Sequence, residues 1–214
     1  PPRSTPVTPR RQRQMCIRDR SNVELVHQDI LTINFADYFG PETPSAIVIG
    51  NLPYNISSQI IVLLIASRVY IRRALLMLQK EMAQRLIASP GNRDYGRLSV
   101  MLQYGAEVKV VAEAPANLFY PRPKVDSQVI SVTTKEHIPY PADDEQMLSR
   151  VVKAGFSQRR KTLRNALAGN ILNADHAQVE SWLARADIDS RRRAETLAVE
   201  EFVRLANLIS RDGG

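Results

Sequence analysis

The stretch IVIGNLPYNISS, residues 47–58, is the part of the sequence that decides the fold. Its apolar run ends at Gly50, as a strand inside a parallel sheet covered on both faces does. A turn with polar, restricted and aromatic residues follows at once: Asn51, Leu52, Pro53 and Tyr54. In open parallel sheets, ligands bind beyond the carboxyl ends of the strands. We therefore place a candidate binding site at this turn.

The residue types of the turn suit one kind of ligand. Asn51 offers a side-chain oxygen as a hydrogen-bond acceptor. Pro53 fixes its own φ and biases Leu52 toward an extended conformation, so the Leu52 carbonyl can be held as a second acceptor. Tyr54 adds a flat face, and the set fits a planar group with an exocyclic amine, such as a nucleobase. The structural alternative is a plain turn with a surface tyrosine.

Strand and helix patterns alternate around this stretch. Short apolar or β-rich runs predict strands at 23–27, 46–50, 73–79, 107–114 and 127–135. The last of them alternates as an edge or antiparallel strand does. Runs bounded by caps or breakers predict helices at 57–67, 80–89 and 96–106. Strands separated by helices indicate an α/β fold with a mainly parallel sheet.

Strand patterns stop after HIPYPADD, residues 137–144, where prolines and then acidic residues mark a domain boundary. Beyond it the sequence predicts only helices, at about 144–155, 158–169, 176–186 and 194–210. We expect an α/β domain at 21–137 and a small helical domain at 138–214. Residues 1–20, rich in Pro and Arg, are predicted to be a disordered or foreign tail, with a basic arm that contacts RNA as the functional alternative.

The charge balance favours a polyanionic partner. With 29 basic and 22 acidic residues the net charge is +7, which fits nucleic acid or an ordinary solvated surface. The single cysteine, Cys16, excludes an internal disulfide framework and fits a reducing compartment. The longest apolar run, 60–66, is too short for a membrane span. The three histidines are isolated, so no metal is implied. We expect a cytoplasmic protein without membrane contact.

Five motifs, in order and at similar spacings, resemble the bacterial small-subunit ribosomal RNA adenine dimethyltransferases: NLPYNISS, LMLQKEMAQRL, YGRLSVMLQY, LFYPRPKVDSQVI and FSQRRKTLRNAL. The likeness covers residues 21–210. It implies a Rossmann-like methyltransferase sheet followed by a small all-helical domain that orients RNA. It also implies transfer of methyl groups from S-adenosylmethionine to N6 of two adjacent adenines near the 3′ end of small-subunit ribosomal RNA. The expected partner is a pre-ribosomal particle, and the expected oligomeric state is a monomer.

The resemblance assigns roles to individual residues. Asn51 and the Leu52 carbonyl, held by Pro53, would accept hydrogen bonds from adenine N6. Tyr54 and Phe119 would stack on the two faces of the flipped base. The predicted cofactor-binding residues are Asp29, against the adenine amine of S-adenosylmethionine, and Asn51. The predicted RNA-binding residues share one basic helical segment: Arg159, Arg160, Lys161 and Arg164.

Each of these assignments has a structural alternative. Asp29 suits a turn cap, Phe119 suits a core aromatic under a proline-rich loop, and the basic segment suits a solvated helix face.

The sequence departs from the family at the cofactor site. Members of the family open with a glycine-rich turn and an acidic residue that hold the methionine and ribose parts, whereas this sequence has no G-x-G stretch. We therefore expect the N-terminal cofactor-binding third to be lacking and S-adenosylmethionine to bind very weakly. The alternatives are an inactive RNA-binding ribosome-assembly factor or gene fragment, and a DNA adenine methyltransferase. The last usually carries a second proline where Leu52 stands and lacks the helical domain.

Overall fold

The computed structural model describes residues 23–40, 46–169 and 171–212. They fall into two compact units, one that ends at Ile33 and one that begins at Asn34. In the first unit, the Asp29 carboxylate caps the short 3-10 helix η1 (Ile30–Thr32) and accepts a hydrogen bond from the Leu31 N–H at 3.0 Å. The strands and α-helices all belong to the second unit. The predicted tail at 1–20 lies outside the described residues.

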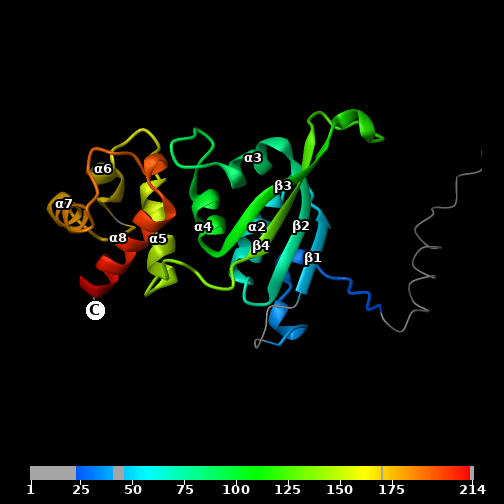
Figure 1. The fold of residues 1–214 in the computed structure, drawn as a ribbon, viewed down its shortest axis with the longest axis horizontal. Coiled ribbons are helices and arrows are strands. Elements are labelled where there is room, and N and C mark those ends of the chain that lie inside the picture. Colours follow the sequence, from blue (N-terminus) through cyan, green and yellow to red (C-terminus); the bar gives the residue numbers. More distant parts are fainter. Residues whose placement is uncertain (1–22, 41–45, 170, 213–214) are drawn as a thin grey trace, which may run out of the picture. The chain divides into compact units, whose positions relative to one another are not determined.

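A four-stranded sheet lies at the centre of the α/β part (Figure 1). Its strands are β1 (Ala46–Asn51), β2 (Ile71–Gln79), β3 (Ala106–Ala114) and β4 (Ser127–Thr134). The order is β1-β2-β4-β3, with β1 and β2 parallel and with β4 antiparallel to both of its neighbours. The predicted α/β class is confirmed, but the sheet is mixed rather than mainly parallel, because β4 inserts between β2 and β3 in the opposite direction.

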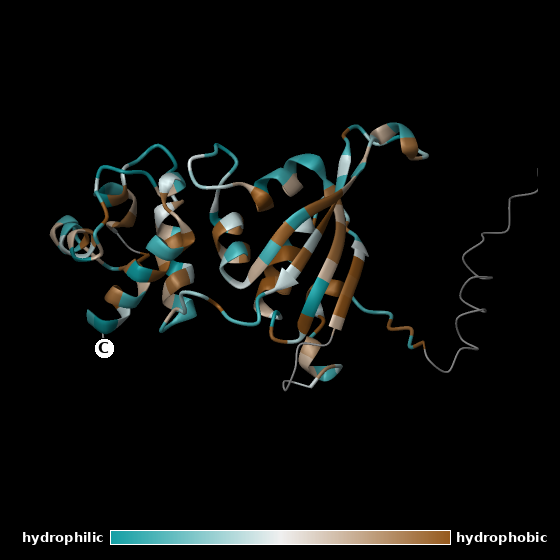
Figure 2. Cartoon of the chain, viewed as in Figure 1, coloured by the Kyte–Doolittle hydropathy of each residue, from teal (hydrophilic) through white to brown (hydrophobic). Residues whose placement is uncertain are grey.

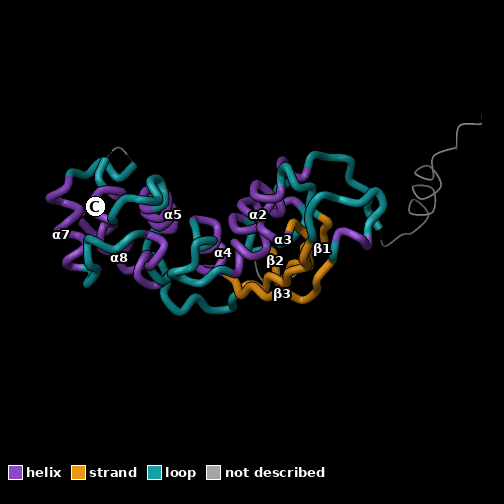
Figure 3. Tube along the Cα trace, turned by 90° about the horizontal axis from the view of Figure 1, so that it is seen from above, coloured by secondary structure: helices purple, strands orange, loops and turns teal. Residues whose placement is uncertain are grey.

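One face of the sheet is covered by helices. These are α2 (Ser57–Ala66), α3 (Lys80–Ile87) and α4 (Arg97–Gly105). Figure 3 shows α2 and α3 on the same side of the strands. Side chains alternate between the faces of a strand, and in β2 this buries Ala74, Leu76 and Leu78. The predicted strands at 46–50, 73–79 and 107–114 and the three predicted helices of this part are confirmed within one or two residues.

The other face of β1 differs from the sequence prediction. Hydrophobic residues run along β1 and β2 (Figure 2), yet Ile47 and Ile49 are 57% and 77% exposed. The sequence predicted a strand covered on both faces. Within the second unit, no described segment covers these two side chains, because α2, α3 and α4 all lie on the opposite side.

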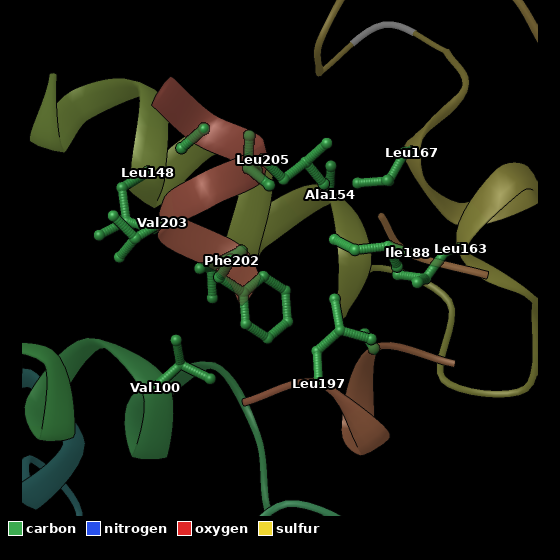
Figure 4. Packing of buried hydrophobic residues seen from close by; sticks show 14 of the residues in the cluster. Val100, Leu148, Ala154, Leu163, Leu167, Ile188, Leu197, Phe202, Val203 and Leu205 are labelled. Carbon is green, nitrogen blue, oxygen red and sulfur yellow. The ribbon is translucent and has the colours of Figure 1, made fainter. Parts of the chain in front are cut away.

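Beyond β4 the described residues form a helical part. Its helices are α5 (Glu145–Gly155), α6 (Leu163–Leu167), α7 (His176–Arg185) and α8 (Val199–Asp212). Asp144 and Asp175 cap α5 and α7 through their carboxylates, as acidic N-cap residues do. A buried core around Leu148, Phe202 and Leu205 holds the helices together, and it includes Val100 of α4 (Figure 4). Residues on both sides of the proposed domain boundary at 137/138 contribute to this core. The boundary therefore stays a prediction.

Three predicted elements need correction. Residues 23–27 form no strand and are exposed, because a strand needs a neighbouring backbone and no described segment pairs with them. The helix predicted at 158–169 spans only Leu163–Leu167. The carbonyls of Arg192 and Ser190 accept its first N–H groups, which fixes the start there. The helix predicted at 194–210 begins at Val199, after the 3-10 turn Ala194–Thr196.

None of the helices in the described ranges is long and apolar enough to cross a membrane.

Candidate functional site

The candidate site lies at the carboxyl end of β1. The Leu52 N–H donates to the Met77 carbonyl at 2.9 Å, which continues the pairing with β2 for one residue beyond the strand. The Leu52 side chain is buried and approaches Gly50, where a Cβ atom would lie 3.1 Å from Leu52 Cδ2. Gly50 therefore leaves room for the Leu52 side chain to pack closely, and Leu52 anchors the turn in the core.

Two hydrogen-bond acceptors of the turn remain free. The Asn51 side chain is exposed, and it forms no hydrogen bond with the other described residues. The Leu52 carbonyl oxygen likewise accepts no hydrogen bond from the part of the chain that the structure describes. A pair of unsatisfied acceptors at a strand end is able to bind an amine with two hydrogens.

Tyr54 is held at both ends. Its hydroxyl lies 3.0 Å from Ser127 Oγ at the start of β4, and its carbonyl accepts from Ser57 Oγ at 3.2 Å. Ser127 is buried, whereas Tyr54 is 39% exposed, so the hydroxyl is fixed while part of the ring stays open. Sequence analysis missed Ser127. The available signal was a small polar residue at the start of a strand rich in β-branched residues.

A pocket of about 360 Å³ joins the turn to the β3–β4 loop. It is lined by the five predicted catalytic residues, which are Asn51, Leu52, Pro53, Tyr54 and Phe119. Four further lining residues were not assigned a role from the sequence: Met77, Tyr120, Pro121 and Pro123. Its volume is at the small end for ligand sites and suits a single ring system better than a large ligand. The structure thus places the five predicted catalytic residues around one pocket, and their roles stay predictions.

The β3–β4 loop is supported by hydrogen bonds at its base. The Asp126 carboxylate accepts from the Ala116 N–H at 2.9 Å, and the Asp126 carbonyl accepts from the Lys80 N–H at 3.0 Å. Gln128, which is buried, accepts from Gln84 at 2.9 Å and donates to Glu113 at 2.6 Å. These bonds tie both ends of the loop to the sheet and to α3, and so they fix the segment that carries Phe119.

Asp29 lies in the first compact unit, before Ile33. One of its oxygens, Oδ1, caps η1, which is the structural alternative that the sequence offered. No described group donates to Oδ2, so one carboxylate oxygen remains for a further amine. Its role toward S-adenosylmethionine stays a prediction.

The basic segment is not a helix face, because three of its four cations precede α6 in a turn. Arg159 pairs with Glu195 and Arg164 with Glu180, at 3.4 and 3.3 Å. Arg160 and Lys161 are exposed and form no ion pair with any residue in the described ranges. Two of the four predicted RNA-binding residues therefore keep their full charge for a partner.

Two larger hollows, of about 560 and 740 Å³, lie beside the segment that joins β4 to α5. Two of the arginines that line the larger one already have acidic partners, since Arg185 pairs with Asp212 and Arg211 with Asp143. Neither lies at the carboxyl end of a parallel strand. We assign the site to the smaller pocket, which combines free acceptors with aromatic faces. Within the described ranges, no group of acidic, histidine or cysteine side chains is arranged to hold a metal ion.

Comparison with known proteins identifies the family. The family model described as "Ribosomal RNA adenine dimethylase" matches residues 11–211, and so it begins inside the segment predicted to be foreign. A Desulforapulum autotrophicum protein named ribosomal RNA small subunit methyltransferase A is 52% identical over 188 residues, which cover 88% of this chain and 66% of the relative. A protein of the same name from Proteus mirabilis is 43% identical over 191 residues, 89% of this chain and 68% of the relative. The chain thus spans about two thirds of the length of the curated relatives it matches.

Solved structures support the fold. A dimethyladenosine transferase from Plasmodium falciparum matches with a TM-score of 0.72 at 24% identity, over 94% of this chain and 78% of that one. The 23S rRNA methyltransferase ErmE matches with a TM-score of 0.63 at 23% identity, over 95% of this chain and 79% of that one. At such identities the likeness shows the fold, and it confirms the Rossmann-like methyltransferase sheet predicted from the sequence. The extent of the family match shows that the chain belongs to the ribosomal RNA adenine dimethylase family.

Proposed function

We propose that the protein transfers methyl groups from S-adenosylmethionine to N6 of two adjacent adenines in small-subunit ribosomal RNA. Family membership supports this proposal, and one observation carries it further. Two acceptors that bind no other described residue, the Asn51 side chain and the Leu52 carbonyl, adjoin a pocket lined by Tyr54 and Phe119. This arrangement suits an adenine held by its amine and by its faces.

The chemistry follows from the adenine amine. Its lone pair is delocalised into the ring, so N6 is a poor nucleophile. Hydrogen bonds from N6 to Asn51 and to the Leu52 carbonyl hold the amine hydrogens out of the ring plane and draw the lone pair out of conjugation. When bound, S-adenosylmethionine would supply an electrophilic methyl group for direct in-line displacement, with the neutral thioether S-adenosylhomocysteine as the leaving group. Each transfer would form one N6–CH3 bond and release one N6 proton to solvent, without a covalent enzyme intermediate.

The described residues fit the cofactor in part. Asp29 keeps one carboxylate oxygen for the adenine amine of S-adenosylmethionine, and Asn51 is exposed beside the pocket. Carboxylate and amide oxygens are ordinary acceptors for such an amine. We propose these two residues as the cofactor contacts of this chain.

Base stacking positions the substrate. Tyr54 is fixed through its hydroxyl, and Phe119 is partly buried on a loop that is tied at its base. Stacking on an aromatic ring contributes about 1–3 kcal/mol per base. The two rings therefore select a planar base and exclude water from its faces.

We propose that the residues that contribute most to RNA affinity lie outside the base pocket. The helical part from residue 138 on would orient the RNA, with Arg160 and Lys161 as its principal phosphate contacts because they have no acidic partner among the described residues. The proposed partner is small-subunit RNA within a pre-ribosomal particle. The proposed state is a monomer in the cytoplasm, where bacterial ribosomes are assembled.

The test is a methyl-transfer assay with small-subunit RNA and labelled S-adenosylmethionine, raised in steps to a concentration that offsets the very weak binding expected from the sequence. Tyr54→Ala should lower the transfer rate by about 5- to 150-fold, the value of one stacking contact, while RNA affinity changes little. The matched control is Tyr140→Ala, which removes a tyrosine that is 56% exposed in the segment between β4 and α5. Equal rates for Tyr54→Ala and the parental chain would refute the stacking role. A parental chain that binds RNA but transfers no methyl group would favour the inactive assembly factor.

A further inference from the structure

The β3–β4 loop, residues 115–126, exposes large apolar side chains. Leu118 is 70% exposed, Tyr120 is 102% exposed and Val125 is 44% exposed. Figure 1 shows the loop extending beyond the end of the sheet. Single exposed apolar residues are ordinary on a protein surface, but here they gather on one projecting segment next to the proposed base pocket.

The loop holds these side chains outward. The Leu118 N–H donates to the Pro115 carbonyl at 3.0 Å, and the Asp126 carboxylate closes the base through the Ala116 N–H at 2.9 Å. Phe119 and Tyr120 both line the pocket, whereas Leu118 does not. Tyr120 is nonetheless fully exposed, so its ring lies at the open rim of the pocket, and Leu118 lies outside it on the same loop.

The same loop is positively charged. Arg122 and Lys124 are exposed, and neither forms an ion pair with a residue in the described part of the chain. No acidic residue occurs at 115–125. The nearest carboxylates in sequence, Glu113 and Asp126, already accept hydrogen bonds from within the fold. The local charge is therefore available to a polyanion, which favours RNA over a protein or a membrane as the partner of this loop.

We propose that Leu118 and Tyr120 form a wedge that enters the base stack of structured RNA beside the target adenine, while Arg122 and Lys124 contact the flanking phosphates. This inference rests on the proposed function. Extracting a base costs its stacking and pairing energy. Proteins that disrupt a stack commonly insert apolar side chains between the bases, and an aromatic ring replaces part of the lost stacking. The wedge would occupy the place that the adenine leaves when it enters the pocket.

Binding to two labelled RNA hairpins tests the wedge. In one hairpin the two adjacent adenines are paired within the stem; in the other, of the same sequence context, they are bulged and already unstacked. The 214-residue chain is titrated into each while fluorescence anisotropy is followed. Leu118→Ala combined with Tyr120→Ala should weaken binding to the paired hairpin by about 5- to 150-fold more than binding to the bulged hairpin, where only the contact of Tyr120 at the pocket is lost.

Two further variants separate the phosphate contacts of the loop from the effect of its apolar side chains. Arg122→Ala with Lys124→Ala should weaken binding to both hairpins equally and flatten the salt dependence of affinity, because phosphate contacts are the same in both. Tyr140→Ala should change neither. Thermal unfolding followed by circular dichroism should give the parental midpoint for the wedge variant, since both of its side chains are exposed.

An equal loss on both hairpins, or no loss on the paired one, would overturn the wedge. A salt dependence left unchanged by the Arg122 and Lys124 substitutions would overturn the phosphate contacts. These readouts measure binding alone, so a chain that binds as described but transfers no methyl group would refute the proposed function without refuting the wedge.

Discussion

Removing the Ser127 hydroxyl should loosen Tyr54 and reveal how the site is held together. Ser127 Oγ lies 3.0 Å from the Tyr54 hydroxyl, and Ser127 is 1% exposed. A hydrogen bond of this kind contributes about 0.5–1.5 kcal/mol net. Because Tyr54 is 39% exposed, water can replace the lost partner. We expect Ser127→Ala to lower the free energy of unfolding by about 1 kcal/mol.

Removing the other hydroxyl of the pair should lower the free energy of unfolding by more. Tyr54→Phe leaves the buried Ser127 hydroxyl without a partner, and an unsatisfied buried group costs about 1–3 kcal/mol. Replacing both partners by apolar groups removes that penalty. In the Tyr54→Phe background, Ser127→Ala should therefore be neutral or stabilising.

Urea unfolding of the parental chain, the two single variants and the double variant measures this coupling as a double-mutant cycle. Additive losses, with Ser127→Ala equally costly in both backgrounds, would refute the contact between the two hydroxyls. As a second readout, Ser127→Ala should lower the rate of methyl transfer without changing RNA affinity, since it acts through the position of the Tyr54 ring.

Three further predictions concern the turn, the helical part and the RNA contacts. Gly50→Ala should lower the free energy of unfolding by about 1–3 kcal/mol in urea titrations, because the new Cβ would lie 3.1 Å from Leu52 Cδ2; an unchanged midpoint would contradict the packing at this turn. Burial tends to raise the pKa of the Glu201 carboxyl, but its hydrogen bonds from Arg192 and the neighbouring backbone outweigh this and hold that pKa below the ordinary 4.5. The ionised Glu201 carboxylate should thus stabilise the folded state above pH 4.5, and this stabilisation should be lost as the pH falls through the lowered pKa. Arg192→Ala should make the free energy of unfolding less dependent on acid pH and should lower it by about 1.5–3 kcal/mol at neutral pH, as urea unfolding at several pH values measures. Arg160→Ala should reduce the slope of log affinity for RNA against log salt by about 0.7–0.9, and substitution of the ion-paired arginines of the same segment should change it less.

The local patterns of the sequence predicted most elements of the fold. The strand at 46–50 and the helix at 57–67 were recognisable because an apolar run, a glycine and two serines follow one another within a few residues. The serines do not cap the helix as predicted, because its N-cap is Ile56 and the Ser57 hydroxyl donates to the Tyr54 carbonyl. The position of β4 within the sheet could not be predicted from the sequence. Its alternation indicated an edge or antiparallel strand. It is antiparallel but not at an edge, because its insertion between β2 and β3 depends on partners that are remote in sequence.

The same limit applies to the site. The Asn51–Tyr54 turn is a local motif and could be assigned a chemistry from its residue types. Ser127 reaches Tyr54 across 73 positions of sequence, and Glu195 neutralises Arg159 across 36. Such pairings depend on the folded arrangement of the chain, so sequence analysis treated all four cations of the basic segment as equivalent.

Mass spectrometry of small-subunit RNA, after incubation with the protein and S-adenosylmethionine at a concentration high enough to offset the very weak binding expected from the sequence, tests the central claim most directly. The account predicts N6,N6-dimethyladenine at two adjacent adenines with the parental chain, and far less with Asn51→Ala, which removes one of the two acceptors for the adenine amine. Methylation at another atom or base, or undiminished dimethylation by Asn51→Ala, would contradict it.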